Sequence, residues 1–369
     1  MKVVFIYRLD ASEKVNAGVI EKLWAQSEAF KALGHSPRLI YLSRGNIEIK
    51  SVEGTITIPG RSRLLAKVFF FSRIKRKINP TDCDLMIIRY GLSYPSFIRF
   101  LSFFRGRHPS LRIAIDFPTF PYSVEWRGIK RPFLGLDRIY RTKLRKYVDR
   151  AITTSNSSEI YGIPALHMPN GIWVNRFPAR KKKSKENTIQ LVAIGKWNFW
   201  HGLDRVIQGI AEYQNLRKHI RPVILKVIGD GPARPGLERM VKDNKLGAVI
   251  EFITDTDEER KNEIFQKADI AIGTLGMHRK GLDYDSSLKH REYCARGIPF
   301  ILSAPDYSFP SSLQFVKYEP PTDEPIDIKN LLHHFDSIQE EINTPEEIRH
   351  YAVNHLNWED QIQKLLNSF

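Results

Sequence analysis

Short apolar runs alternate along the chain with longer segments whose apolar residues recur at helical spacing. The runs Lys2–Tyr7, Leu85–Arg89 and Ile189–Ile194 are typical of buried strands. In Val19–Leu33 the apolar residues instead recur at the period of an amphipathic helix. Strands that alternate with helices in this way form parallel sheets covered by helices on both faces. The pattern therefore predicts the α/β fold class.

One stretch, residues 270–305, carries more polar chemistry than the rest of the chain. Two apolar runs, ADIAIGTL and GIPFILSA, flank a segment from Ser287 to Arg296 that has helix chemistry. Ser286 or Ser287 can serve as its N-cap, and Gly297 can end it. These elements predict a βαβ unit. Open α/β sheets bind ligands at the carboxyl ends of their strands, where a helix N-terminus attracts phosphate.

Candidate ligand-binding residues gather at that end of the βαβ unit. His278, Arg279, Lys280 and Lys289 supply positive charge. Glu292 lies one turn into the predicted helix, where its carboxylate can accept hydrogen bonds from two vicinal hydroxyls of a sugar. The stretch therefore predicts a site for a phosphorylated sugar compound. A buried strand followed by a solvated basic loop is the alternative that the pattern leaves open.

The length of the chain predicts two domains. A single domain of average size is shorter than 369 residues. The Lys-rich segment ARKKKSKEN, residues 179–187, has the composition of an interdomain linker. We therefore expect one domain over residues 1–178, a second over 188–345, and a helical tail over 346–369.

Charge is distributed unevenly between the two halves. Residues 1–180 hold 31 Lys and Arg against 13 Asp and Glu, a net charge of +18, whereas the remaining residues carry −2. The first half is therefore expected to face an anionic partner, such as a membrane surface, a nucleic acid or an anionic substrate. No nucleic-acid-binding motif accompanies the charge, so we expect no nucleic-acid partner.

Two segments of the first half are both basic and apolar, Arg61–Ile78 and Ser96–His108. A basic amphipathic helix can lie in a membrane interface, where each cation near an anionic surface contributes roughly 1 kcal/mol. The apolar residues can equally belong to the core. For Ser96–His108 we favour the core, and for Arg61–Ile78 both interpretations stay open.

Cysteine use and the N-terminus bound the cellular context. Cys83 and Cys294 are far apart, which predicts neither a disulfide framework nor a zinc site and fits a reducing compartment. The N-terminal apolar run is too short for a signal peptide, and no run is long enough for a transmembrane helix. We expect a cytoplasmic protein, peripheral on the inner face of the plasma membrane.

Two loops of the first half follow predicted strands. The loop RLDASEKVNAG contains Gly18, which would allow the backbone to approach a ligand, but the segment lacks the G-x-G-x-x-G pattern of NAD and FAD sites. The second loop, DFPTFPYSVEWRG, offers Asp116, Thr119, Tyr122 and Glu125. We interpret it as acceptor-site machinery, with a structural Pro-rich corner as the alternative.

Several spaced motifs resemble the family 4 glycosyltransferases. VAIGKWNFWHGLDRVIQGI resembles the Gly-Arg … Lys-Gly element of that family, with Lys196 at the usual Arg position and His201 at the usual Lys position. VIGDGPARPGLERMV resembles the G-D-G-P stretch, and SSLKHREYCARGIPFILS resembles the helix that carries the E-x7-E signature. IRYGLSYP, DFPTFPYSVE and YGIPALHMPNGI resemble a bacterial subset that builds capsular and other surface polysaccharides.

The resemblance implies a GT-B fold, with two Rossmann-like domains facing across a cleft and a C-terminal helix that crosses back to the first domain. It also implies a retaining hexosyltransferase that uses a nucleotide diphosphate sugar, needs no metal, and acts on a saccharide or lipid-linked saccharide acceptor. The catalytic residues it implies are Lys196, Asp116 and Lys289. The donor-binding residues it implies are Gly18, Gly195, His201, Gly229, Ser287, Leu288, Glu292, His278 and Arg279.

One position departs from the family pattern. Glu292 matches the second glutamate of E-x7-E, but Tyr284 stands where the first would fall, between Asp283 and Asp285. Either an aspartate replaces that glutamate or the sugar is recognised differently. The D-x-D pattern that these residues spell belongs to another fold, so no catalytic metal is expected. The rival functions are a nucleotide-sugar epimerase of the same fold and a non-catalytic basic protein that binds nucleic acid or membrane.

Overall fold

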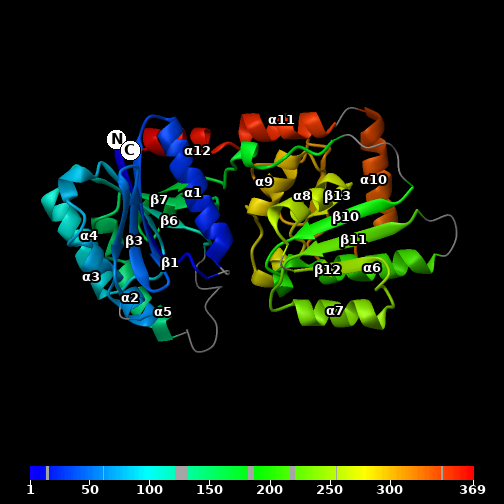
Figure 1. Ribbon diagram of the computed structural model, residues 1–369, viewed down its shortest axis with the longest axis horizontal. Helices are drawn as coiled ribbons and strands as arrows, with labels where there is room; N and C mark the ends of the chain where they lie inside the picture. The colour runs from blue at the N-terminus through cyan, green and yellow to red at the C-terminus, as the bar shows by residue number, and fades with distance from the viewer. Residues whose placement is uncertain are drawn as a thin grey trace. The chain divides into compact units, whose positions relative to one another are not determined.

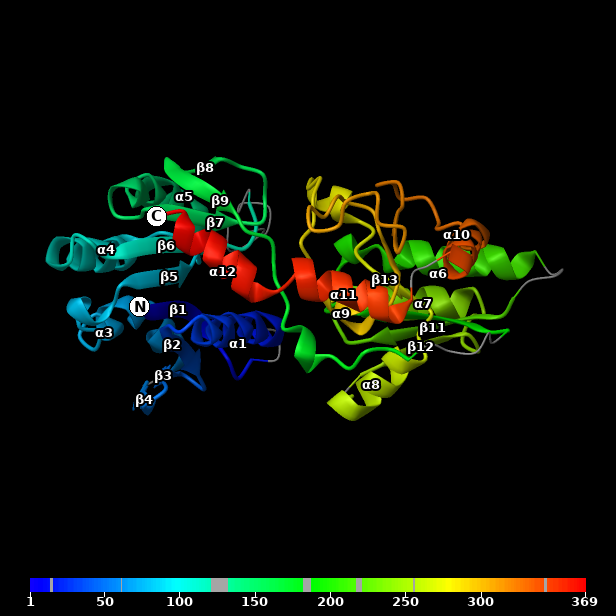
Figure 2. The same cartoon turned by 90° about the horizontal axis from the view of Figure 1, so that it is seen from above.

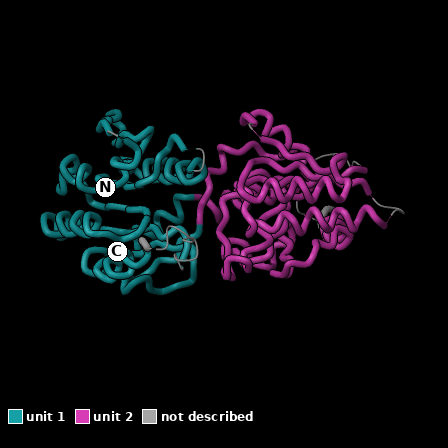
Figure 3. Tube along the Cα trace, turned by 90° about the horizontal axis from the view of Figure 1, so that it is seen from below, with its two compact units in different colours: residues 1–169, 358–369 teal, residues 170–357 magenta. Residues whose placement is uncertain are grey.

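The computed structural model describes residues 1–13, 16–60, 62–120, 132–181, 187–216, 221–254, 256–341 and 344–369. The chain folds as two compact units (Figure 3). Unit 1 comprises Met1–Pro169 and Trp358–Phe369, and unit 2 comprises Asn170–Asn357. Each unit contains a mostly parallel sheet with helices on both faces (Figure 1).

The described part of unit 1 contains a nine-stranded sheet in the order β4-β3-β2-β1-β5-β6-β7-β9-β8. Six neighbouring strands, β2, β1, β5, β6, β7 and β9, run parallel to one another. The remaining three are antiparallel to their neighbours, with β3 and β4 at one edge of the sheet and β8 at the other. Its strands are β1 (Lys2–Asp10), β2 (Ser36–Ser43), β3 (Asn46–Ser51), β4 (Gly54–Ile58), β5 (Leu85–Arg89), β6 (Arg112–Phe117), β7 (Arg150–Thr153), β8 (Glu159–Ile160) and β9 (Ile163–His167).

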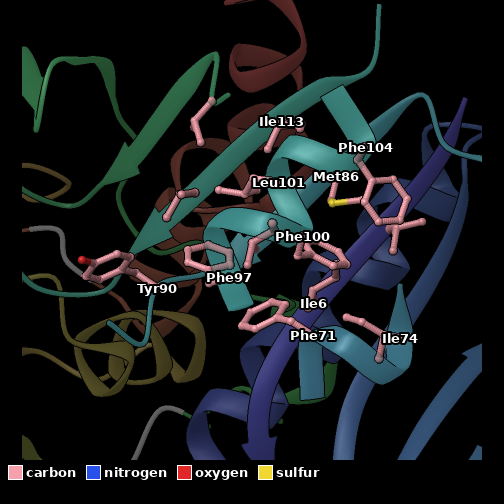
Figure 4. Close-up of a cluster of buried hydrophobic side chains, with 14 of the residues drawn as sticks. Ile6, Phe71, Ile74, Met86, Tyr90, Phe97, Phe100, Leu101, Phe104 and Ile113 are labelled. Atoms are coloured by element: carbon pink, nitrogen blue, oxygen red, sulfur yellow. The ribbon is translucent and has the colours of Figure 1, made fainter. Parts of the chain in front are cut away.

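Helices bury both faces of this sheet, which is why its central strands β1, β5 and β6 are buried almost continuously rather than on alternate residues. Helices α1 (Ala17–Ala32) and α12 (Trp358–Asn367) pack side by side on one face (Figure 1, Figure 2). The other face packs against the Phe-rich helices α3 (Phe70–Ile74) and α4 (Pro95–Arg107), shown in Figure 4. Helices α2 (Arg63–Val68) and α5 (Pro132–Arg141) complete the described α-helices of this unit.

The described part of unit 2 contains a six-stranded parallel sheet in the order β12-β11-β10-β13-β14-β15. Its strands are β10 (Ile189–Ile194), β11 (Val223–Ile228), β12 (Ile250–Ile253), β13 (Ile270–Ile272), β14 (Phe300–Leu302) and β15 (Val316–Tyr318). Helices α6 (Leu203–Asn215), α7 (Arg234–Asp243) and α10 (Ile328–Glu341) share a core with one face. Helices α8 (Glu258–Gln266), α9 (Leu288–Arg296) and α11 (Pro345–His355) share a core with the other.

The predicted α/β class is confirmed, as are the strand at Leu85–Arg89 and the βαβ unit formed by β13, α9 and β14. Gly18 was expected in a loop, but α1 begins at Ala17 and places it in the first helical turn. The helical tail expected over 346–369 is two helices, of which α12 alone belongs to unit 1. None of the described helices has both the length and the hydropathy of a membrane span.

The expected linker, residues 179–187, remains a prediction, and its residues 182–186 lie outside the described ones. Its first residues pack on unit 2. The Arg180 guanidinium donates to the Ala268 carbonyl at 2.7 Å, and the Gln266 side chain joins the backbone of Ala179 and Lys181. The chain passes from unit 1 to unit 2 after Pro169 and returns to unit 1 at Trp358.

Candidate donor site at the carboxyl edge of unit 2

The strand order of unit 2 reverses between β10 and β13. From β10 the chain continues to β11 on one side, while β13 pairs with the other side of β10. Connections therefore leave the carboxyl ends of these two strands in opposite directions, which opens a crevice for ligands in sheets of this type.

Tyr293 of α9 joins the two strands at that point. Its fully buried hydroxyl donates to the Ile272 carbonyl at 3.0 Å and accepts the Ile194 N–H at 3.2 Å. Burial raises the pKa of this hydroxyl far above its usual value, so it stays protonated. The tyrosine thereby holds α9 against both strand ends.

Close backbone packing shapes the strand ends beside α9. Gly229, after β11, has a φ of 109°, and a Cβ there would overlap the Gly195 carbonyl oxygen. Gly202, with a φ of 67°, fits against the backbone of Leu275. Only glycine meets both demands, because a side chain would be strained at these φ values as well as obstructed. Gly195 and Gly229, both predicted site residues, therefore lie together.

The N-terminus of α9 points its free backbone donors toward this edge. Ser287 is the N-cap residue, as predicted, with extended backbone angles. Its side chain makes no capping hydrogen bond with the described residues. The first-turn N–H groups, including that of Leu288, are therefore left without the usual side-chain cap. Such groups bind anions, helped by the positive end of the helix dipole.

Lys289, in the first turn of α9, carries a buried ammonium group. Only 8% of the residue is exposed, and its Nζ has no hydrogen-bonding partner among the described residues. Nζ lies 5.5 Å from the ring centroid of Trp197, a buried residue whose indole Nε1 also lacks a described partner. Burial lowers the pKa of Lys289 to about 8, although the nearby Asp285 carboxylate raises it in part.

Asp285 supplies an acceptor next to this ammonium group. Its Oδ1 accepts the Ser286 N–H at 2.7 Å. Its Oδ2 is buried and has no hydrogen-bonding partner among the described residues, with His290 Nε2 at 3.7 Å. Tyr284, the residue at the motif position, is instead buried in a small apolar cluster with Leu282 and Met277.

A buried ion-pair network lies behind the first turn of α9. The Arg291 guanidinium forms a bidentate pair with the Asp306 carboxylate, and its Nε donates to the Asn170 carbonyl at 2.8 Å. His290 Nδ1 lies 3.2 Å from Asp306, and His290 Nε2 accepts the Thr274 N–H at 3.2 Å. Burial alone would raise the pKa of Asp306, but Arg291 and His290 hold it below its usual value. The network fixes α9 to the loop after β14.

Other predicted residues have partners within the protein. Glu292 Oε1 accepts from Arg296 Nε at 2.9 Å. Arg279 forms a bidentate pair with Asp204, both bonds at 2.8 Å, which raises its pKa. These contacts orient both side chains, and an incoming ligand would have to share or displace the partners.

The remaining predicted residues of unit 2 differ in exposure. Lys196 is exposed in the loop after β10. His201 Nδ1 accepts the Asn198 N–H at 2.9 Å, which leaves the proton of the neutral ring on Nε2. Burial, and then the charge of Lys289, lower the pKa of His201 well below its usual value, so the ring is neutral. His278 Nε2 lies 3.1 Å from Asp323.

Two predicted residues belong to unit 1. Gly18 is exposed in the first turn of α1, and a side chain there would meet nothing within 4 Å. Asp116, at the end of β6, is buried and pairs with Lys22 at 3.5 Å and with Arg89 at 3.4 Å. Tyr122 and Glu125 of the predicted acceptor loop lie outside the described residues.

The sequence interpretation missed the roles of Tyr293, Trp197 and the Arg291–Asp306 pair. A signal was present, because the helix LKHREYCAR lies between two apolar strands and yet is mostly polar. A helix in that place must bury several of its polar side chains, which requires partners. Among the described residues, no three His, Cys, Asp or Glu side chains are placed to hold a metal ion.

Comparison of the sequence with known protein families gives no match. Comparison with curated proteins gives none either.

Solved structures do match. The glycosyltransferase from Rickettsia africae ESF-5 has a TM-score of 0.65 at 14% identity, over 99% of this chain and 97% of that one. The sucrose-phosphate synthase from Thermosynechococcus elongatus has a TM-score of 0.64 at 15% identity, over 100% of this chain and 98% of that one. Anabaena HepE in complex with UDP-glucose has a TM-score of 0.61 at 12% identity, over 100% of both chains.

These matches establish the fold, which is the GT-B architecture of glycosyltransferases with two Rossmann-like domains. The predicted GT-B fold with two Rossmann-like domains is therefore confirmed.

Proposed function

We propose that this protein is a retaining glycosyltransferase that moves a hexose-type sugar from a nucleotide diphosphate sugar to a hydroxyl of a saccharide acceptor. The observation that carries the proposal is the buried ammonium group of Lys289 at the N-terminus of α9, which has no hydrogen-bonding partner among the described residues. A buried ammonium group without a partner is costly, and an anionic ligand would offset that cost. The carboxyl edge of a Rossmann-like sheet in a GT-B fold is a suitable place for such a ligand.

In this proposal the diphosphate lies against Lys289 and the N–H groups of Ser287 and Leu288, with exposed Lys196 closing over it. As the bond between the anomeric carbon and the diphosphate oxygen breaks, its electron pair leaves with the nucleoside diphosphate, and negative charge grows there. The acceptor hydroxyl bonds to the anomeric carbon and gives its proton to the leaving phosphate oxygen. Fixed donors that stabilise this charge accelerate the reaction, and losing one typically costs about 2.7–4 kcal/mol. No metal is assigned to the site.

Sugar and ribose recognition follow from the same edge. Asp285 takes the place of the first signature glutamate, because its buried Oδ2, which has no hydrogen-bonding partner among the described residues, can accept a hydroxyl of the transferred sugar. Glu292, oriented by Arg296, holds the ribose hydroxyls. Gly195 and Gly229 allow the donor close to the backbone, and His201, His278 and Arg279 shape the surrounding loops. In unit 1, Gly18 and Asp116 contribute to the donor and acceptor sites.

The acceptor is proposed to be a lipid-linked saccharide of surface polysaccharide synthesis, used at the cytoplasmic face of an anionic membrane. The motif resemblance supports this class of acceptor. Charge supports it too, since unit 1 holds 30 Lys and Arg against 15 Asp and Glu, whereas unit 2 is nearly balanced at 27 against 26. Cations near an anionic membrane surface concentrate the protein there.

A thermal-shift screen with UDP, GDP, CDP and their hexose derivatives tests the donor site, beginning with UDP-glucose. A ligand at 100 times its dissociation constant should stabilise the fold by about 2.7 kcal/mol. We expect one nucleotide family to raise the melting temperature of the wild-type protein, and the Lys196→Ala and Glu292→Ala variants to lose most of that shift. If no nucleotide shifts the wild-type protein, the proposal fails. Interconversion of free nucleotide sugars without transfer would identify an epimerase instead.

A further inference from the structure

Helix α2 of unit 1 exposes a cluster of large apolar side chains. Leu64, Leu65, Val68 and the following Phe69 have exposed fractions of 72%, 42%, 50% and 52%. We call these four residues the α2 patch. Figure 1 shows α2 on the outside of unit 1, where it packs against β3 and α3.

The structure separates the α2 patch from the core, a choice that the sequence left open for Arg61–Ile78. Phe70, Phe71 and Ile74 of α3 are buried in the cluster drawn in Figure 4. In α2 the single buried residue is Ala66. The apolar residues of Ser96–His108 belong to the core, as favoured, because Phe97, Phe100 and Phe104 are buried.

Small residues explain how α2 sits on the unit while its larger side chains face outward. Ala66 packs beside Gly60, where a Cβ would overlap the Gly45 carbonyl oxygen. The helix thus approaches the backbone closely through its smallest side chain. Two ion pairs join α2 to the end of β1 and the loop after it. Arg63 lies 3.9 Å from Asp10, and Lys67 lies 3.2 Å from Glu13. The apolar face is therefore held rigidly outward.

The segment that carries the α2 patch is strongly basic, although Asp10 and Glu13 pair with two of its cations. Residues 54–81 contain seven Lys and Arg and no Asp or Glu. Two of these cations, Arg76 and Lys77, are exposed just after α3. Neither forms an ion pair with an acid among the described residues. Apolar side chains beside several cations complement a bilayer with anionic headgroups. The apolar side chains enter the membrane interface, and the cations contact the phosphate groups of the lipids.

We propose that the α2 patch inserts into the interface of an anionic bilayer and docks unit 1 on the membrane. This docking rests on the proposed function, in which the acceptor is lipid-linked. It deepens that function by naming the residues that contact the lipid. Docking itself needs neither donor nor acceptor, so it can be measured separately from transfer.

The first test is co-sedimentation of the full chain with phosphatidylcholine vesicles and with mixed phosphatidylcholine–phosphatidylglycerol vesicles. We expect binding to the mixed vesicles. The Leu64→Ser/Phe69→Ser double variant should bind them about tenfold more weakly, equivalent to 1.4 kcal/mol. Leu216→Ser is the matched control, because Leu216 is 55% exposed in unit 2 and should not affect binding. The nucleotide-induced thermal shift of each variant reports whether the fold and donor site are intact.

A second test places a probe on the α2 patch. Cys83 and Cys294 are both fully buried, so a Phe69→Cys variant can be labelled with an environment-sensitive fluorophore at one exposed thiol. We expect its emission to shift to the blue on anionic vesicles, with no such shift for a labelled Leu216→Cys control.

Three results would each overturn the proposal, and two of them concern the patch itself. The patch variant could bind the mixed vesicles as well as the wild-type protein, or gel filtration could show that the patch joins two copies of the chain. Vesicle binding without any nucleotide response would leave docking intact and reject the transferase. The third result is a nucleotide response without any binding to the mixed vesicles, which would reject docking and leave the proposed transferase intact.

Discussion

At the scale of single residues, Lys289 and its neighbour Asp285 are the most informative. Both present a buried charged atom without a hydrogen-bonding partner among the described residues. Lys289 lies in the first turn of α9, and Asp285 lies two residues before its N-cap, Ser287. Proteins rarely bury such groups without a partner, because desolvation is costly. Their position at the strand ends makes a bound ligand the simplest partner.

Lys289 should give nucleotide binding a dependence on pH. Its pKa is lowered from 10.5 to about 8 in the folded protein, so it loses its proton before the unfolded chain does. Affinity for a nucleoside diphosphate should therefore fall as pH rises through about 8, as titration calorimetry would measure. Over the window from about 8 to 10.5, the unfolded chain binds the additional proton, so the ligand-free protein should gain stability as pH rises.

The Lys289→Met variant provides the control for both effects. Met retains the length of the side chain without its charge, so nucleotide binding should be weak at every pH, and the alkaline gain in stability should disappear. An affinity that falls equally in wild type and variant would show that another group titrates.

Tyr293 acts on the geometry of the strand ends. In Tyr293→Phe, the Ile194 N–H and the Ile272 carbonyl lose their buried partner, which should lower the free energy of unfolding by about 1–3 kcal/mol. Urea unfolding measures this change. Tyr307→Phe is the control variant. It removes a hydroxyl from an exposed tyrosine and should lower the free energy of unfolding by much less. Equal effects in the two variants would deny Tyr293 its bridging role.

At the scale of elements, α9 combines a binding end with an anchored body. Its N-terminus presents donors, while Arg291, His290 and Asp306 fix it to the loop after β14. A helix that must hold ligand donors in place benefits from such support, since a small displacement weakens fixed electrostatic interactions.

Loss of that support should be costly. Asp306→Asn leaves the Arg291 guanidinium buried without its carboxylate, and we expect the free energy of unfolding to fall by about 3–5 kcal/mol. Because the pKa of Asp306 is lowered, its contribution is present above the ordinary carboxyl pKa of 3.8 and is lost as pH falls through its folded value. Urea unfolding across acidic pH would measure both effects.

The exposed pair of Arg221 and Asp336 provides the matched control. Asp336→Asn removes a pair in solvent, which typically contributes about 0–1 kcal/mol. A comparably small effect of Asp306→Asn would contradict the supporting role of the buried pair.

At the scale of the whole molecule, the chain leaves unit 1 after Pro169 and returns to it at Trp358. The last helix thus completes a core that begins with the first strand. Trp358 is buried with Phe5, Leu23 and Ile87, and Lys22 Nζ lies 5.8 Å from its ring centroid. Folding of unit 1 is therefore complete only when both ends of the chain are present.

Trp358→Ala should accordingly destabilise unit 1, by about 3–5 kcal/mol as for other buried aromatic residues. Chemical denaturation followed by circular dichroism would show the lowered midpoint. Trp173→Ala is the control, because that ring is 46% exposed in unit 2. A midpoint that moves no further for Trp358→Ala than for Trp173→Ala would mean that α12 contributes little to the core.

The sequence by itself determined the layered α/β fold and pointed to the carboxyl edge at which the candidate site lies. Both follow from local patterns, since apolar runs such as Leu85–Arg89 and the turn at Gly297 depend on nearby residues alone. The uneven charge was equally visible, because charge is a property of composition.

Only the tertiary structure decided which polar residues are buried and which already have partners. Arg279 and Lys289 look alike in the sequence, yet Asp204 neutralises the first, while the second is buried without a described partner. The tertiary structure also divided the basic, apolar segment Arg61–Ile78 into core residues in α3 and the exposed α2 patch. Burial and pairing depend on contacts between distant parts of the chain, and no local pattern specifies them.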